Sequence, residues 1–214
     1  MPEDRYPGYD VLAKRDTPSW NEQTRRVIDK RLAIPDRPRF LNAQEWDTLA
    51  AICDRVVPQP SHRPAIPVAA LVDDKLRRNA GDGYRNAKLP PLREAWRTGL
   101  AALDAEAQQA HGLPFHRLAD AAKDAFLTRM QQSTLRHPAW GAMPPALFFG
   151  TRMVRDIVHA YYAHPTAWNE IGFGGPASPR GYVRMGFDRR DSWEAAEAKD
   201  GDVERARREN ARVG

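Results

Sequence analysis

Two histidines and one glutamate come nearest, in type and spacing, to a catalytic or metal-binding set in this chain. His159 and His164 lie five residues apart, and Glu170 follows on the same segment. Imidazole nitrogens and carboxylates are good ligands for zinc or iron. Two histidine ligands on one helical face, however, need a spacing of four. Ordinary surface or hydrogen-bonded histidines are the simpler interpretation, and a stand-alone helical enzyme or ligand-binding protein is the alternative that these residues keep open.

The stretch from residue 161 to residue 184 concentrates aromatic and arginine side chains on a backbone rich in glycine and proline. Such side chains are enriched at protein interfaces because they combine a large contact area with a polar group. We therefore predict a partner interface made by Tyr161, Tyr162, Trp168, Phe173, Arg180, Tyr182 and Arg184. A loop that caps the protein's own core and a small-molecule site are the two alternatives.

The motifs of nucleotide binding and nucleophilic catalysis are absent from the sequence. There is no G-x-S-x-G elbow, no P-loop, and no G-x-G-x-x-G after a strand pattern. The run Gly172-Phe-Gly-Gly is too short for a dinucleotide fingerprint and lies in a helical context. We therefore predict no catalytic, cofactor-binding or metal-binding residues, and a chain that is not an enzyme by itself.

Apolar residues at helical spacing predict five main helices. They run over about residues 43–57, 67–79, 92–111, 115–132 and 146–163. Asn42 and Glu45 form a capping-box pattern at the start of the first, and Gly112 suits the end of the third. No strand pattern is present, so the sequence predicts an all-α protein.

The helices predict a single helical domain over residues 41–186, flanked by two segments of a different kind. Residues 1–40 have little periodicity and are expected to form an extended N-terminal arm, with one exposed helical stretch near residues 24–32. Residues 187–214 are charged and, apart from Trp193, have almost no large apolar side chain. We therefore expect this tail to be flexible or to be ordered by a partner.

Charge and composition narrow the class of protein. Lys and Arg number 33 against 28 Asp and Glu, and the two signs alternate along most of the chain. A solvated mixed surface is expected, with no nucleic-acid partner, and a basic nucleic-acid-binding module is the rival interpretation. Cys53, the only cysteine, lies on an apolar helical stripe and is expected to be buried.

The sequence contains no apolar stretch long enough to span a bilayer. Residues 1–31 contain no signal-peptide core, so a cytoplasmic location is expected. Export to the periplasm would depend on a signal carried by a partner.

Two segments resemble a known family. The run His-Pro-Thr-Ala-Trp-Asn-Glu-Ile-Gly-Phe-Gly-Gly-Pro at residues 164–176, followed by Pro-Arg-Gly-Tyr at 179–182, resembles the C-terminal signature of the gluconate 2-dehydrogenase subunit 3 family. Residues 40–58 are similar to that family's first helix, and the resemblance extends over about residues 38–186.

The resemblance implies a helical, non-catalytic small (gamma) subunit in a heterodimer or larger complex. Its partner would be the large flavin-dependent subunit of a glucose–methanol–choline-type dehydrogenase, which oxidises a sugar, sugar acid or polyol. The small subunit would bind and stabilise that partner, or help it to mature or be exported. FAD and the hydride chemistry would belong to the partner. Many family members carry a twin-arginine export signal, which this sequence lacks, and the family offers no catalytic residue to carry over.

Overall fold

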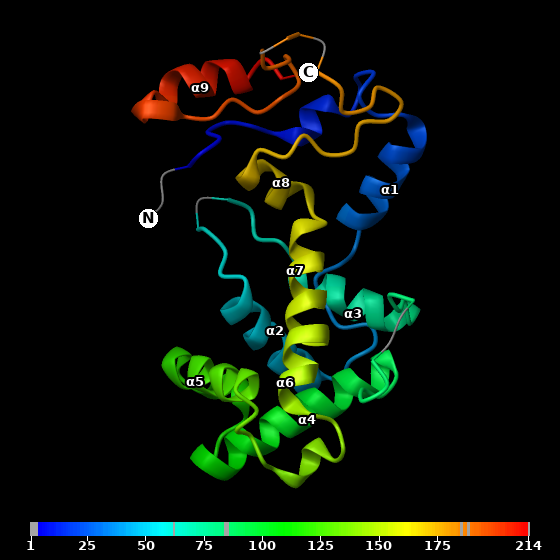
Figure 1. Cartoon of the computed structure of the whole chain (residues 1–214), viewed down its shortest axis with the longest axis vertical. Coiled ribbons are helices and arrows are strands. Elements are labelled where there is room, and N and C mark those ends of the chain that lie inside the picture. Colours follow the sequence, from blue (N-terminus) through cyan, green and yellow to red (C-terminus); the bar gives the residue numbers. More distant parts are fainter. Residues whose placement is uncertain (1–3, 62, 84–85, 185, 188, 214) are drawn as a thin grey trace. The chain divides into compact units, whose positions relative to one another are not determined.

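The computed structural model describes residues 4–61, 63–83, 86–184, 186–187 and 189–213, and its regular elements are helices. In chain order they are η1 (Val11–Lys14), α1 (Glu22–Leu32), α2 (Ala43–Val56), α3 (Val68–Arg78), α4 (Leu92–His111), η2 (Phe115–Arg117), α5 (Asp120–Gln131), η3 (Pro138–Trp140), α6 (Pro145–Phe148), η4 (Phe149–Met153), α7 (Val154–Tyr162), α8 (Pro165–Ile171), η5 (Lys199–Gly201) and α9 (Val203–Asn210) (Figure 1). Within the described residues an isolated bridge between Trp20 and Ser178 is the nearest approach to a sheet. The predicted all-α class is confirmed, with more helices than the five main ones expected.

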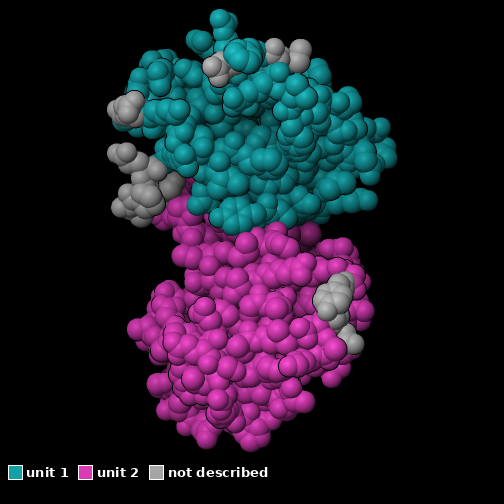
Figure 2. All heavy atoms as spheres, viewed as in Figure 1, with its two compact units in different colours: residues 1–33, 162–214 teal, residues 34–161 magenta. Residues whose placement is uncertain are grey.

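Contacts divide the chain into two compact units, which are coloured separately in Figure 2. Unit 1 consists of Met1–Ala33 and Tyr162–Gly214, and unit 2 is Ile34–Tyr161. This division differs from the expected boundaries after residues 40 and 186, because the first and last segments of the chain pack together within unit 1. No helix in the described ranges has both the length and the apolar content needed to cross a membrane.

Unit 2 begins with a helix whose start is fixed by its own sequence. The Asn42 side chain accepts from the Glu45 amide at 2.9 Å, and the Glu45 carboxylate accepts from the Asn42 amide at 2.9 Å, which completes the predicted capping box. From there α2 contacts α3, α4 and α5, and its apolar face, including Ile52 and Cys53, is buried. Burial raises the pKa of the Cys53 thiol, so this cysteine is an unreactive core residue.

The structure confirms the predicted end of one helix of unit 2 and divides another predicted helix in two. α4 ends at Gly112 in the left-handed conformation, as expected, with φ of 68°. The predicted helix over residues 115–132 is interrupted: η2 is followed by extended backbone at Leu118 and Ala119, and α5 begins only at Asp120. The interruption accompanies a tertiary contact, because the Phe115 amide donates to the buried Asp104 carboxylate at 3.0 Å.

The helix from Pro145 to Tyr162 is continuous and contains one turn of π-helix, η4. Its first turn packs closely on α4, since a Cβ added to Gly99 would lie 2.3 Å from the Phe148 ring. One turn beyond η4, the buried Asp156 accepts from Lys75 Nζ and from Trp96 Nε1, each at 2.8 Å. These hydrogen bonds compensate the buried carboxylate and tie α3, α4 and α7 together.

Unit 1 has its own core, formed by Tyr9, Val11, Trp20, Ile28, Trp168 and Val213. Segments from both ends of the chain contribute to this core, and η1, α1 and α9 all belong to this unit (Figure 1). The buried Asn210 side chain donates to the Pro7 carbonyl at 2.9 Å and accepts from the Ala196 amide at 2.7 Å. Residues 189–213 are therefore packed on the N-terminal segment, whereas the tail was expected to be flexible or ordered by a partner. The N-terminal segment contains η1 in addition to α1, which includes the helical stretch expected near residues 24–32.

Candidate functional site

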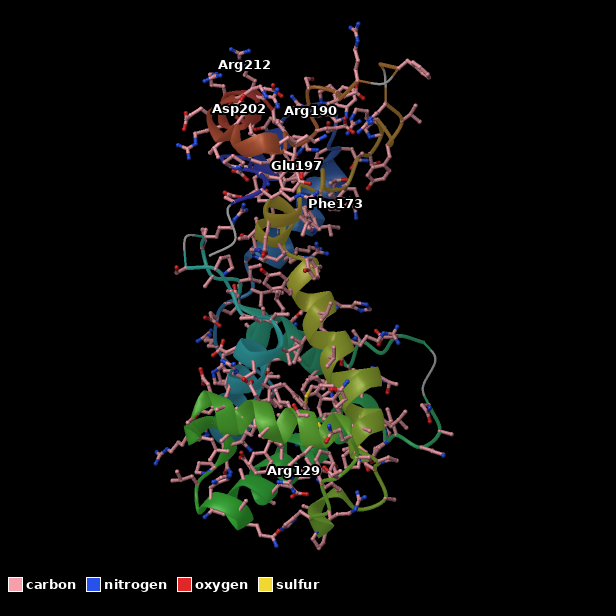
Figure 3. The ribbon with its side chains drawn as sticks, turned by 60° about the vertical axis from the view of Figure 1, so that its left-hand side comes forward. Arg129, Phe173, Arg190, Glu197, Asp202 and Arg212 are labelled. Atoms are coloured by element: carbon pink, nitrogen blue, oxygen red, sulfur yellow. The ribbon has the colours of Figure 1, made fainter. Side chains whose placement is uncertain are left out.

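A pocket of about 580 Å³ lies in unit 1. Its walls come from three segments: the loop after α8, the stretch of residues 190–199, and two side chains of the N-terminal segment, Tyr6 and Lys14. Figure 3 shows Phe173, Arg190 and Glu197, which belong to this wall, in the upper part of the view.

The glycine-rich run shapes one wall of the pocket. Gly172 ends α8 with φ of +66°, and a Cβ there would lie 2.5 Å from the Tyr6 ring. Gly175 also has φ of +66°, and its Cβ would lie 3.0 Å from Val11 and 3.3 Å from Trp168. Glycine adopts this backbone without strain and leaves room for the neighbouring side chains. The run is therefore a packing motif that lets the loop approach the core of unit 1.

Trp168 packs against this wall of the pocket. It is 5% exposed, and its Nε1 donates to the Tyr162 carbonyl at 2.6 Å. The Phe173 ring meets it edge to face, with 5.7 Å between centroids. Trp168 is therefore a core residue of unit 1, as the core-capping alternative describes, and the pocket and the exposed surface are formed by its neighbours.

The other residues of the predicted interface divide into two groups. Phe173, Arg180, Tyr182 and Arg184 all line the pocket. Tyr161 is buried and belongs to unit 2, whereas Tyr162 is exposed in unit 1, away from the pocket lining. The structure thus brings together the part of the predicted set that follows Gly172.

Lys14 is the most unusual side chain at the pocket because it is fully buried. Its Nζ donates to the Gly174 carbonyl and, at 3.4 Å, to the Trp193 carbonyl. Burial, with a smaller contribution from Arg180, lowers the pKa of this amine to about 8. The charged form of Lys14 is therefore destabilised by the loss of its hydration and by the neighbouring Arg180.

Arg180 lies with its guanidinium carbon 4.0 Å from the centroid of the Trp193 ring, and its Nε donates to Ser19 Oγ at 3.1 Å. The carboxylates of the wall have other cations: Glu194 accepts from Arg184 Nε at 3.0 Å, and Glu197 pairs with Arg5. The pocket consequently has an excess of positive charge.

Sequence reasoning missed several wall residues: Tyr6, Lys14, Arg190, Trp193, Glu194, Ala195, Glu197 and Lys199. Trp193 had a signal, since it is the one tryptophan in a charged tail. Lys14 had none, because lysine is a surface residue in most proteins and nothing local marks it as buried.

A group of apolar side chains follows the pocket wall in sequence, and we call Tyr182, Val183 and Phe187 the exposed loop patch. Their exposed fractions are 70%, 75% and 97%. Single exposed apolar residues are common on protein surfaces, but three large ones within six positions are typical of an interaction surface.

The candidate metal set is not assembled as a site. His159 is exposed on α7, in unit 2. His164 is buried in unit 1, where its Nδ1 accepts from the Thr166 amide at 3.3 Å and caps α8. Burial first, and Arg31 second, lower the pKa of His164, so its neutral form is favoured. Glu170 lies on α8, and within the described residues no group of three or more His, Cys, Asp or Glu side chains is arranged to hold a metal ion.

Comparison with known proteins gives a family match. The sequence model of a family described as gluconate 2-dehydrogenase subunit 3 matches residues 43–175, from the first residue of α2 to the glycine-rich run. No curated protein and no solved structure matches the chain.

Proposed function

The chain belongs to the gluconate 2-dehydrogenase subunit 3 family, and from that membership we propose that it is the small subunit that binds and stabilises a flavin-dependent dehydrogenase. The family description makes the chain a subunit of a dehydrogenase complex and suggests a non-catalytic role. The finer proposal is that its partner oxidises a sugar, sugar acid or polyol, and that the two chains form a hetero-oligomer.

The exposed loop patch is the observation that carries the binding role. Phe187 is 97% exposed and Tyr182 is 70% exposed, on irregular backbone. Removing one such side chain from water contributes roughly 1.5–3 kcal/mol. A partner that covers this patch gains that energy and also lowers the population of the unfolded subunit by mass action.

The assignment of FAD binding and hydride transfer to the partner rests on the secondary structure of this chain. Its described residues form no parallel strands, and the Gly172–Gly175 run ends a short helix instead of joining a strand to a helix. A dinucleotide fold needs that strand-to-helix turn to hold the pyrophosphate. We therefore propose that FAD and the hydride transfer belong to the partner, and we expect the purified chain to be colourless.

The cellular location also follows from the partner in this proposal. In one case the partner carries an export signal and this chain accompanies it to the periplasm; in the other case the partner carries none and does not export this chain. Fractionation of cells that express both chains, compared with cells that express this chain alone, distinguishes the two cases.

The test is co-expression with the flavoprotein encoded nearest to this chain's gene, followed by affinity capture and titration of the purified subunits. The double variant Tyr182→Ala/Phe187→Ala should weaken the complex about 30-fold or more, corresponding to about 2 kcal/mol. Val27→Ala is the matched control, because Val27 is an exposed apolar residue of the same unit, on α1, with 44% exposure.

The isolated double variant should melt within about 2 °C of the parent, since exposed side chains contribute little to stability. A complex that forms equally well with the parent and the double variant would show that the exposed loop patch is not the contact. Failure to capture any flavoprotein would remove the proposed function itself.

A further inference from the structure

The guanidinium of Arg180 is only partly engaged within its own chain. One face stacks on Trp193, with 4.0 Å between the guanidinium carbon and the ring centroid, and Nε donates to Ser19 Oγ at 3.1 Å. Among the residues that the structure describes, neither Nη atom has an acceptor within hydrogen-bond distance, and no carboxylate pairs with this arginine. Arg180 therefore has one fixed orientation and a free edge with its donors in the fork geometry that matches a carboxylate.

Lys14 adds a second positive charge, which forms no ion pair among the described residues; Glu194 raises its pKa from a longer distance. Its side chain is fully buried, and its acceptors in the described part of the chain are the neutral carbonyls of Gly174 and Trp193. An ammonium has three donors, so one remains beyond these two contacts. Burying a charge that has no ion-pair partner is costly, and groups of this kind cluster at functional sites.

The two acids of the pocket form ion pairs with other cations. Glu194 is engaged by Arg184 and Glu197 by Arg5. The remaining positive charge therefore faces a cavity with aromatic walls, formed by Tyr6, Phe173, Tyr182 and Trp193. Its volume of about 580 Å³ is in the range of small-molecule sites.

We propose that this pocket is an anion site for a carboxylate attached to a flat, apolar body, with Arg180 making the bidentate contact and Lys14 supplying the second positive charge. The aromatic walls cover the body of the ligand. Tyr6, Lys14 and the wall residues from 180 to 199 lie outside the range 43–175 that the family model matches, so the site is a property of this chain beyond that match.

The carboxylate has two sources with the same chemistry. One is a free organic acid. The other is a carboxylate of the partner dehydrogenase that lies next to an aromatic side chain of the same partner, and this source rests on the proposed function. In both cases the group contacts Arg180, so one set of variants tests both.

The first arm of the test titrates the purified full-length chain with benzoate, using calorimetry and tryptophan fluorescence. Benzamide is the uncharged probe of the same shape. We expect saturable benzoate binding that is at least tenfold tighter than benzamide binding. Arg180→Gln should weaken it at least tenfold, Lys14→Met should weaken it several-fold, and Arg180→Lys should retain part of it.

Arg212→Gln is the matched control, because Arg212 is an exposed arginine of the same unit outside the pocket lining (Figure 3). Each variant is first melted, and Arg180→Lys, which keeps a cation beside Trp193, shows whether a loss in Arg180→Gln comes from binding or from folding.

The second arm measures the complex with the flavoprotein. If benzoate does not bind but Arg180→Gln weakens the complex tenfold, the carboxylate comes from the partner and the site is supported. Equal binding of benzoate and benzamide overturns it. So does the absence of any effect of Arg180→Gln in both arms. A complex that is lost in Tyr182→Ala/Phe187→Ala but unchanged in Arg180→Gln, with no benzoate binding, refutes the anion site and leaves the proposed function standing.

Discussion

Replacing the buried lysine of unit 1 by a residue of similar length without charge, Lys14→Met, should stabilise the isolated chain at neutral pH. Lys14 is fully buried, and burial lowers its pKa from 10.5 to about 8. A difference of this size corresponds to about 3 kcal/mol of preference for the neutral form, at 1.36 kcal/mol for each pH unit. Methionine fills similar space and does not carry this cost.

The substitution also removes two hydrogen bonds. The contact to the Trp193 carbonyl is long, at 3.4 Å, and Gly174 is half-buried, so water can hydrate its carbonyl. The loss is therefore near the low end of the range for an unpaired acceptor, about 1–2 kcal/mol. The net expectation is that Lys14→Met is more stable than the parent by about 1–2 kcal/mol at pH 7.

The pH dependence gives a second, independent readout. The folded-state pKa of Lys14 lies below its unfolded value, so the unfolded chain binds more protons between pH 8 and pH 10.5. The cost of the buried charge is fully present below pH 8 and is relieved as the pH rises towards 10.5. Arg180 and Glu194 are the charged groups that act on this titration, the first lowering and the second raising the pKa of Lys14.

The assay is urea unfolding of the parent and Lys14→Met at pH 7, 8, 9 and 10, followed by tryptophan fluorescence and circular dichroism, with m-values compared to test two-state behaviour. The difference between the two proteins should shrink and then change sign above pH 9. Lys30→Met is the matched control, because Lys30 is an exposed lysine on α1. A variant that is less stable by 3 kcal/mol or more at pH 7, with a difference independent of pH, would refute the reasoning and make Lys14 a structural clamp.

Three further substitutions test the packing. Gly172→Ala should destabilise the chain by about 3 kcal/mol in thermal melts, since the strain of a φ of +66° adds to the clash of a Cβ 2.5 Å from the Tyr6 ring. Gly181→Ala is the control and should cost about 1 kcal/mol, because Gly181 has a φ of +79° but no described atom within 4 Å of an added Cβ. Asn210→Ala should cost about 2–3 kcal/mol by urea unfolding, because it removes three buried hydrogen bonds, and no effect would mean that α9 is not held as described. Asp156→Asn should cost about 1–3 kcal/mol in circular dichroism melts, because Lys75 loses one of its two carboxylate partners and keeps Asp82.

The local elements could be read from the sequence because their signals are local. The capping box at Asn42 and Glu45 fixed the start of α2, and Gly112 marked the end of α4. Prolines before and after the helices limited their lengths, and the apolar stripe placed Cys53 inside. A helix also brings its own hydrogen bonds, so its existence depends little on distant residues.

The partial failure at residues 115–132 shows the limit of such signals. The apolar spacing there favours one helix, but the Phe115 amide donates to Asp104, which lies 11 residues earlier, and the chain turns before α5. Periodicity reports which residues share a face and does not report which backbone groups are taken by tertiary partners.

Tertiary contacts alone determine that the two terminal segments of the chain are packed and ordered. The last helix has no apolar stripe, yet Ala206 and Asn210 are buried because a small side chain and a polar one fit against the N-terminal segment. In the same way the Val11 amide donates to Asn169 at 2.8 Å, across 158 positions of sequence. Their polar composition predicts that such segments are exposed to solvent. They are packed only because another part of the chain has a surface that fits them.

The aromatic and arginine content of residues 161–184 predicted a partner interface, and four of the seven residues named for it line the pocket. Which of these side chains is core and which is surface was decided by the fold, which buries Trp168 and leaves Tyr182 exposed. The burial of Lys14 was decided in the same way. A side chain's type sets the free energy of hiding it from water, but whether it is hidden depends on residues brought beside it from more than 150 positions away.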